Sequence, residues 1–252
     1  MSFFGKVKLY DLTQPISHLT PPWPTYEPLQ IKFFKRLAPN GANGQLLTHS
    51  NHVGTHLDGS MHFCTHGRDI ASIPLEELVA PGVIVDVSDI AEDYGIYTSK
   101  DIMERADVRE GDILIINTGY HRYAYDQPEA DEVRYMIKHP GPTMEFVDWC
   151  KKMKFKWLGV DCGSADHPMN TKIREWMPTQ AAECEKYFQE KYGKSIGEIF
   201  PPSHYQLMHT QVLMEMEDID KLLNNRTVIG CFPWRFVGGE SCICRIVAFH
   251  EE

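Results

Sequence analysis

The chain has 252 residues, of which 35 are acidic and 25 are lysine or arginine, which gives a formal net charge of -10. Because no basic run offsets this charge, it argues against nucleic acid or an anionic membrane surface as a partner and favours a small neutral or modestly charged substrate. A hydrophobic content of 42% and a charged content of 24% are typical of an ordinary soluble globular protein.

The N-terminus and the cysteines bear on the cellular compartment. Residues 1–8 lack the long apolar stretch of a signal peptide, and no later segment approaches the length of a membrane span. The seven cysteines are odd in number and form no Cys-x-x-Cys pair, which suits reduced thiols. We therefore expect a cytoplasmic protein with no membrane partner.

Apolar, β-branched runs alternate with helix-like stretches along most of the chain. The first strand is predicted over residues 7–12, followed by a proline-rich loop at 21–24 and a second strand over 29–34. After a histidine-rich segment, nearly continuous apolar runs indicate strands that are buried on both faces. These buried strands are predicted at 82–87, 112–117 and 157–161.

The helices between these strands are predicted from capping residues and apolar stripes. Ser99 is a fair N-cap for a helix over 99–106, and an apolar stripe over 143–153 indicates a helix that faces the core. A third helix is predicted over 179–192, stopping at Gly193. The predicted fold class is α/β. Because the sequence shows no linker and no repeat, we expect a single mixed α/β domain spanning residues 1–252. Closing strands are predicted at 226–232 and 242–249.

Three histidines and an aspartate stand at even-numbered positions in a window of eleven residues. By composition alone such a window would hold about 0.5 histidines, so chance clustering is a poor explanation. In an extended chain alternate side chains share a face, so the four donors would lie together while the residues between them pack on the other face. The donors are His52, His56, Asp58 and His62.

The donor segment has to bend to bring its side chains together. A straight strand would hold the alpha carbons of His52 and His56 roughly 13 Å apart, too far for comfortable shared ligation. A helix would bring them closer, but residues 53–55 are poor helix formers. We therefore predict a strand that bends at Gly54 and Gly59, where glycine lets the backbone curl.

The donor set indicates a metal site. Imidazole nitrogen and carboxylate oxygen suit zinc, manganese or iron better than calcium. Three ligands, predicted as His52, His56 and Asp58, leave positions open for water, which favours catalysis. Isolated histidines such as His49 and His121 are more simply surface or hydrogen-bonded core residues.

Residues outside this segment are candidates for substrate binding. Trp23 and Tyr26, in the proline-stiffened loop, and Trp234 would suit a flat aromatic substrate, although an aromatic in such a loop more often packs on its own domain. Ser164 follows a buried strand, and strand ends commonly carry function in α/β sheets, but a polar turn is an equal alternative. Asp161 either supports a metal-bound histidine or caps the next turn.

Several motifs are absent from the sequence. The chain has no Gly-x-Gly-x-x-Gly after a strand, no phosphate-binding Gly-x-x-x-x-Gly-Lys-Ser/Thr, no His-Glu-x-x-His and no Gly-x-Ser-x-Gly elbow. Functions based on a nucleotide cofactor or a serine nucleophile therefore lose support.

The histidine segment closely resembles the signature of the metal-dependent cyclase family, which includes bacterial kynurenine formamidase, isatin hydrolase and related amide hydrolases. The match is specific because it fixes four donors, a Gly-Thr pair and a trailing phenylalanine. Other segments extend the resemblance over nearly the whole chain, and the later ones point more to the isatin-hydrolase-like branch. The matching segments are residues 52–58 with 62–63, 10–16, 159–166, and 232–235 with 238–240.

The resemblance implies the swivelling β/β/α fold of the family and a zinc or manganese ion on the first two histidines and the aspartate. His62 would ligate a second metal or act as a base. A later histidine completes the site in the family, with His209 as the best match and His204 second. The glutamate that follows it would be Glu215 or Glu217, or absent, because the interval after His209 is short.

The implied function is hydrolysis of a C–N amide bond by a metal-activated water. His62 would handle the water proton and His209 would protonate the leaving nitrogen. The substrate would be an isatin-type lactam or an aryl formamide. The alternatives are a non-catalytic metal-binding member of the family and a hydrolase of a small lactone or other cyclic ester.

The resemblance also implies a homodimer or homotetramer. The apolar residues Phe3, Phe4, Phe33 and Phe34 are compatible with such an assembly, but they fit a core equally well.

Overall fold

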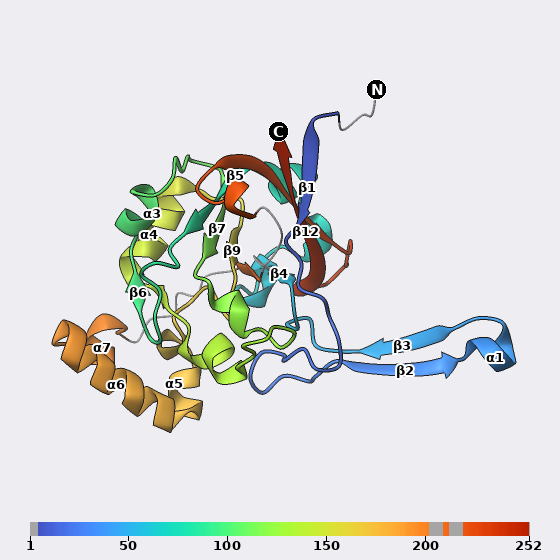
Figure 1. Cartoon of the computed structure of the whole chain (residues 1–252), viewed down its shortest axis with the longest axis horizontal. Coiled ribbons are helices and arrows are strands. Elements are labelled where there is room, and N and C mark those ends of the chain that lie inside the picture. The colour runs from blue at the N-terminus through green and yellow to red at the C-terminus, as the bar shows by residue number, and fades with distance from the viewer. Residues whose placement is uncertain (1–4, 202–208, 212–218, 252) are drawn as a thin grey trace.

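The structure is organised around a mixed sheet of eight strands. It is a computed structural model that describes residues 5–201, 209–211 and 219–251. In these ranges the strand order is β1-β12-β11-β5-β7-β9-β10-β4, and β4 pairs with β12 as well, so the sheet closes on itself (Figure 1). The strands are β1 Val7–Asp11, β4 His56–Asp58, β5 Val79–Asp86, β7 Ile113–Asn117, β9 Leu158–Val160, β10 His209–Gln211, β11 Arg226–Pro233 and β12 Ser241–Glu251.

The centre of this sheet is parallel and buried on both faces. β5, β7, β9 and β10 run parallel in adjacent positions, whereas the other pairings are antiparallel. Along β7, Leu114 and Ile116 belong to one hydrophobic core, while Ile113 and Ile115 belong to the other. This alternation follows from the two-residue repeat of a strand. The predicted mixed α/β fold with strands buried on both faces is confirmed.

Helices cover one face of the sheet. Phe146 of α4, Phe188 of α6 and Ile196 of α7 pack into the core that contains Leu114 and Ile116, on the left in Figure 1. The three predicted helices are confirmed, and α6 ends at Gly193 in the left-handed conformation as expected. The helices are α1 Leu37–Asn40, α2 Leu75–Leu78, α3 Ser99–Met103, α4 Met144–Met153, α5 Ile173–Trp176, α6 Pro178–Tyr192 and α7 Ile196–Ile199.

The predicted N-cap of α3 is wrong by one residue. Thr98 caps this helix, because its hydroxyl accepts from the backbone N–H of Asp101 while the Asp101 carboxylate accepts from the backbone of Thr98. Ser99 lies in the first turn instead, where its hydroxyl donates to Glu145 of α4. The helix is also shorter than predicted, ending at Met103.

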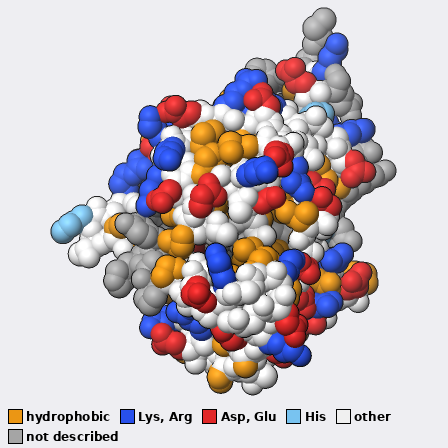
Figure 2. All heavy atoms as spheres, turned by 90° about the vertical axis from the view of Figure 1, so that its left-hand side faces the viewer, with side chains coloured by type: hydrophobic (Ala, Val, Ile, Leu, Met, Phe, Trp, Pro, Cys, Tyr) orange, Lys and Arg blue, Asp and Glu red, His pale blue; other side chains and the backbone are white. Residues whose placement is uncertain are grey.

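The surface on the helical side has no region of a single charge. Figure 2 shows acidic and basic side chains intermixed over this face, with small apolar groups between them. Within the described ranges, no helix is both long and apolar enough to cross a membrane.

A β-hairpin extends away from the body of the molecule (Figure 1). Its strands are β2 Gln30–Lys35 and β3 Gly44–Thr48, and all six residues of β2 are exposed. Phe33 is 37% exposed and Phe34 63%, so neither belongs to the core. Phe3 and Phe4 lie outside the described residues. A two-stranded hairpin is only marginally stable alone in water. The expected homodimer or homotetramer stays a prediction.

A further short pairing joins β6 Ile96–Tyr97 to β8 Gly141–Pro142.

Truncation of a central strand residue should destabilise the fold. Ile115 is fully buried, so Ile115→Ala leaves a cavity and should lower the free energy of unfolding by about 2–5 kcal/mol in denaturant titration. Leu46→Ala on the exposed hairpin is the matched control and should change it by less than about 0.5 kcal/mol. Equal losses in the two variants would contradict the packing described here.

Candidate metal centre

The donor segment folds around a very short strand. β4 contains only His56–Asp58, so the prediction of one bent strand through residues 52–62 is wrong in extent. His56 and Asp58 alternate along β4 as predicted, whereas His52 lies in the preceding loop and His62 in a 3₁₀ turn, Ser60–His62. The donors therefore come together from three different local structures.

The two glycines serve different purposes. Gly54 has a φ of +61°, the left-handed conformation that turns the chain between His52 and His56. Gly59 has an ordinary φ of -85°, so the predicted curl at this residue is wrong. A side chain at Gly59 would instead place its Cβ 3.1 Å from the carbonyl oxygen of Glu240. The absence of a side chain allows the close approach of these two segments.

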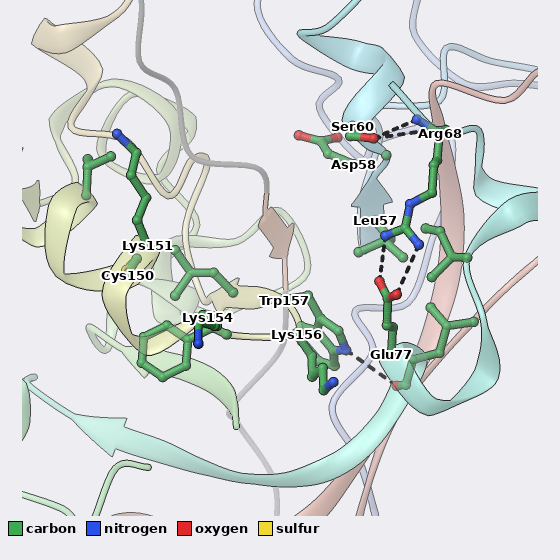
Figure 3. Close-up of a pocket in the computed structure, with 16 residues that line it drawn as sticks. Leu57, Asp58, Ser60, Arg68, Glu77, Cys150, Lys151, Lys154, Lys156 and Trp157 are labelled. Carbon is green, nitrogen blue, oxygen red and sulfur yellow. Dashed lines mark hydrogen bonds and ion pairs between the residues drawn. The ribbon is translucent and has the colours of Figure 1, made fainter. Parts of the chain in front are cut away.

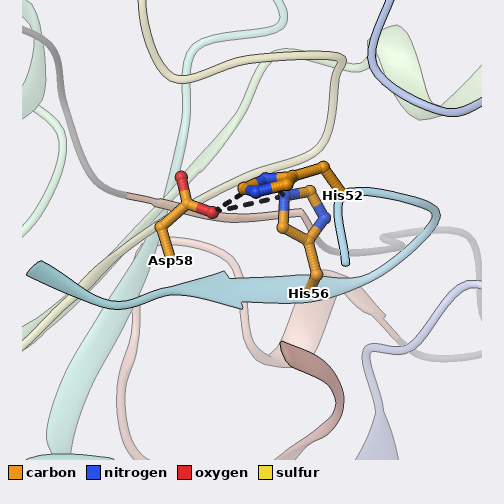
Figure 4. Close-up of side chains that lie close together, drawn as sticks. All are labelled: His52, His56 and Asp58. Atoms are coloured by element: carbon orange, nitrogen blue, oxygen red, sulfur yellow. Dashed lines mark hydrogen bonds and ion pairs between the residues drawn. The ribbon is translucent and has the colours of Figure 1, made fainter. Parts of the chain in front are cut away.

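Two imidazoles and a carboxylate converge in the interior (Figure 4). Nδ1 of His52 lies 3.3 Å from Nε2 of His56 and 3.2 Å from Oδ1 of Asp58, and the last two atoms are 3.5 Å apart. Ligands roughly 2.0–2.1 Å from a tetrahedral ion lie about 3.3–3.4 Å from one another. All three residues are buried, and their spacing fits one divalent cation.

The second nitrogen of each imidazole is held by the protein. Nδ1 of His56 lies 2.8 Å from the carbonyl oxygen of Gly54, and Nε2 of His52 lies 2.9 Å from Oε2 of Glu240. Metal-bound histidines almost always donate their other N–H to such an acceptor, which fixes the ring orientation. The nitrogens that face Asp58 are therefore presented as ligands.

The electrostatics favour a positive charge at this position. Burial lowers the pKa of His52, but the hydrogen bonds to Asp58 and Glu240 outweigh it and raise the pKa to about 9. Burial raises the pKa of Glu240, but hydrogen bonds from His52, His62 and Asn51 hold it well below its usual range. A divalent cation would take the place of the His52 proton.

A cavity of about 340 Å³ opens onto the three donors. Trp23 and Ser164 both lie on its wall, where they were predicted to bind substrate, and so does His62. Trp23 is placed by its backbone N–H, which donates to the carbonyl of His52 at 2.9 Å, and its ring also packs against the hydrophobic core. The cavity wall consists of Pro21, Trp23, Tyr26, His52, His56, Asp58, His62, Phe63, Met136, Gly163, Ser164, Asp166, Thr171, Lys172 and Trp176.

The other candidates for substrate binding differ in whether they line this cavity. Trp234 is 65% exposed and does not line this cavity, so its predicted placement is wrong. Ser164 also forms a polar turn, because its hydroxyl accepts from the backbone N–H of Asp166. Asp161 holds the turn after β7, accepting from the backbone N–H groups of Thr118 and Gly119 and from Nδ1 of His121. Asp161 therefore caps a turn, but the turn after β7 rather than the next one along the chain.

Of the two downstream histidines, His209 lies among the described residues. His209 begins β10, whose backbone pairs with Leu158 of β9 and, at Thr210, with Leu57 of β4, so the chain here passes beside the donor strand. The catalytic role predicted for His209 stays a prediction. His204, Glu215 and Glu217 lie outside the described residues.

The sequence did not assign a role to Glu240. One oxygen of this carboxylate lies 2.9 Å from His52 and 2.6 Å from His62, which makes it part of the site. The segment 238–240 matches the family pattern. Its one acidic residue, which follows two glycines, is the sequence feature that could have indicated a role in the site. Nothing in the spacing of the chain linked it to histidines so far upstream.

A second cavity, of about 370 Å³, also has Asp58 on its wall (Figure 3). Its wall includes Lys154 and Trp157, and its Arg68 and Glu77 form an ion pair at 2.6 Å. No histidine lines it. Although it is the larger of the two cavities, it offers no set of metal ligands among the described residues.

Fold and site together define a mixed α/β protein with a buried His-His-Asp group whose geometry suits a divalent cation. The Cyclase family model ("Putative cyclase") matches residues 10–167, and the chain belongs to this family. Kynurenine formamidase from Bacillus cereus is 26% identical over 163 residues, covering 64% of this chain and 71% of that protein. The Bacillus anthracis enzyme is 26% identical over 166 residues, covering 66% and 73%.

Solved structures share the fold across almost the entire chain. Isatin hydrolase A from Ralstonia solanacearum superimposes with a TM-score of 0.71 at 20% identity, covering 98% of this chain and 93% of that one. Isatin hydrolase A from Labrenzia aggregata gives a TM-score of 0.73 at 18% identity, covering 98% and 95%. The cyclase-family fold implied by the sequence is confirmed.

Cation binding should release a proton at neutral pH. With a pKa of about 9, His52 is protonated at pH 7 when no metal is bound, and a ligating nitrogen must lose its proton. Zinc affinity should therefore rise about tenfold per pH unit between pH 6 and 8 and level off above the pKa. Calorimetry in two buffers of different ionisation enthalpy should show about one proton released at pH 7. A pH-independent affinity would contradict this assignment.

Proposed function

We propose that the protein is a metal-dependent hydrolase that cleaves the C–N amide bond of a small substrate. The observation that carries the proposal is the convergence of His52, His56 and Asp58, 3.2–3.5 Å apart, on the wall of a substrate-sized cavity. The kynurenine formamidases and isatin hydrolases to which the chain is similar support it. All seven cysteines are free thiols, which suits a cytoplasmic enzyme.

The bound cation would be zinc or manganese, since two imidazoles and a carboxylate suit either ion. When bound, a divalent cation lowers the pKa of a water molecule towards neutrality and polarises a carbonyl oxygen. His52, His56 and Asp58 would hold it at the base of the cavity, where burial keeps bulk water away from the donors.

Two further histidines are assigned to proton transfer. His62 lines the cavity and is held through Nδ1 by Glu240, so its other ring nitrogen is suited to accept a proton from the attacking water. His209 is proposed to donate a proton to the leaving nitrogen; the path of β10 alongside β4 and β9 supports this role.

The substrate is proposed to be aromatic or cyclic, as an isatin-type lactam or an aryl formamide. The rings of Trp23, Tyr26 and Trp176 line the cavity and suit a flat substrate, and about 340 Å³ accommodates a small bicyclic molecule. Ser164 would supply a hydrogen bond at the polar side of the cavity. Attack on a lactam would open the ring to a carboxylate, whereas attack on a formamide would release formate.

Removing a ligand should remove metal and activity together. We expect about one zinc or manganese per wild-type chain by elemental analysis, with hydrolysis of isatin or N-formylkynurenine. His56→Ala and Asp58→Ala should lose the ion and at least about 100-fold in activity. His49→Ala, whose imidazole lies outside the donor group, should keep both.

The same samples distinguish the alternatives. Metal that is lost in the ligand variants, without hydrolysis of any amide, would favour a non-catalytic metal-binding protein. Hydrolysis of lactones or other cyclic esters alone would favour the esterase alternative. A folded wild-type protein that binds no zinc or manganese after reconstitution would overturn the proposal.

Substrate binding should depend on the ring in the cavity wall. Trp23→Ala removes an aromatic surface beside the donors, so kcat/KM for an aromatic amide should fall about 10–100-fold, mainly through KM. Trp234→Ala removes an exposed indole away from the cavity and should leave kcat/KM within about twofold. Equal values for Trp23→Ala and the wild type would remove Trp23 from the binding site.

A further inference from the structure

We propose that Glu240 is a positioning residue, whose single carboxylate oxygen holds His52 and His62 and thereby fixes which ring nitrogen each histidine presents to the site. This inference rests on the proposed metal centre. It adds a residue from the far end of the chain to two of the three histidines in the donor segment, His52 and His62.

The contacts of Glu240 all reach the donor segment. Oε2 accepts from Nε2 of His52 at 2.9 Å and from Nδ1 of His62 at 2.6 Å, while Oε1 accepts from the side-chain amide of Asn51 at 3.1 Å. The backbone is fixed as well, because the carbonyl of Glu240 accepts from the N–H of Gly59 at 2.8 Å. The glutamate is thus held at both its backbone and its carboxylate.

The distances distinguish a positioning role from ligation of a second ion. His52, His62 and Glu240 also have donor atoms within 4.8 Å of one another, so they form a geometric alternative for a cation. Two ligands of one tetrahedral ion lie about 3.3–3.4 Å apart. The contacts of Glu240 at 2.9 and 2.6 Å are hydrogen-bond lengths, whereas those among His52, His56 and Asp58 have the ligand spacing.

A neutral imidazole has a single nitrogen lone pair, and this also favours a positioning role for Glu240 over ligation of a second ion. A neutral ring has one N–H and one nitrogen lone pair, and an ionised carboxylate can only accept. Once a metal ion has displaced its second proton, His52 donates through Nε2 and keeps its lone pair on Nδ1, the nitrogen that faces His56 and Asp58. It has no lone pair left for a second ion beside Glu240.

The same rule sets the tautomer of a neutral His62. Because its Nδ1 donates to Glu240, the lone pair lies on Nε2, and this nitrogen becomes the available base in the cavity. One carboxylate therefore has two roles. It orients the metal ligand His52, and it determines which nitrogen of His62 can accept a proton.

The test compares Glu240→Ala and Glu240→Gln with Glu183→Gln as the matched control. Glu183 also accepts two hydrogen bonds, from Lys138 and Tyr94, but lies on α6 outside the donor group. Zinc affinity is measured by competition with a chelator at fixed pH, zinc stoichiometry by elemental analysis, and kcat and KM on the same zinc-loaded samples.

We expect Glu240→Ala to bind zinc about 10–100-fold more weakly with the stoichiometry unchanged, and to lose kcat more than KM. Glu240→Gln, which keeps one acceptor oxygen of the same shape, should recover part of both. The control should match the wild type. If Glu240→Ala does not fold, as judged by circular dichroism, the isosteric glutamine variant carries the test alone and should still show weakened zinc binding.

Two outcomes would overturn the proposal. Unchanged zinc affinity in the folded Glu240 variants would remove the positioning role. A fall from two zinc ions to one, with the affinity of the remaining ion unchanged, would make Glu240 a ligand of a second ion instead. Zinc binding that depends on Glu240 in a protein without hydrolase activity would uphold the positioning role while the proposed function fails.

Discussion

Burial of a carboxylate between two imidazoles is the constraint on which the rest of the site depends. Asp58 is 6% exposed, and an ionised group at that depth needs compensating charge or hydrogen bonds. The short strand β4 supplies the geometry, since β12 pairs with it along all three residues and β10 pairs with Leu57 between the two donors. The strand through which the sheet closes therefore also carries two of the three donors, His56 and Asp58.

The parallel strands give this site a rigid support. Their residues alternate between two cores, so β7 cannot shift by one residue without exchanging every buried side chain between them. The turns after β7 and β9 are tied together by Asp161, and Ser164 follows directly on the cavity wall. The backbone that carries Ser164 is therefore held in place by the strand β9 before it and by the hydrogen bonds of Asp161.

The sequence predicts those parts of the fold that depend on local patterns. Apolar runs located the central strands, and Gly193 marked the end of α6, because periodicity and capping act within a few residues. The donor group is equally local, since its four members, His52, His56, Asp58 and His62, share one segment of eleven residues. The hairpin was harder, because the run containing Phe33 and Phe34 has the composition of a strand but carries no sign that it leaves the core.

Longer-range features lay beyond such patterns. Glu240 stands 188 residues from His52, and neither spacing nor composition connects the two. Gly59 was assigned a bend because it is a glycine, whereas its lack of a side chain matters for the approach of Glu240. Contacts set by sheet closure become visible only once the strand order is known.

The position of Glu240 also has a consequence for how the protein matures during synthesis. His52, His56 and Asp58 leave the ribosome early, long before Glu240 and the strand β12 that closes on β4. Chains are made at roughly 5–20 residues per second, so about 9–38 seconds separate the synthesis of His52 from that of Glu240, 188 residues later. During that interval the donor side chains lack the contacts that Glu240 and β12 make with their segment in the folded protein. Only after residues 240–251 have been made can β12 pair with β4 and Glu240 contact His52.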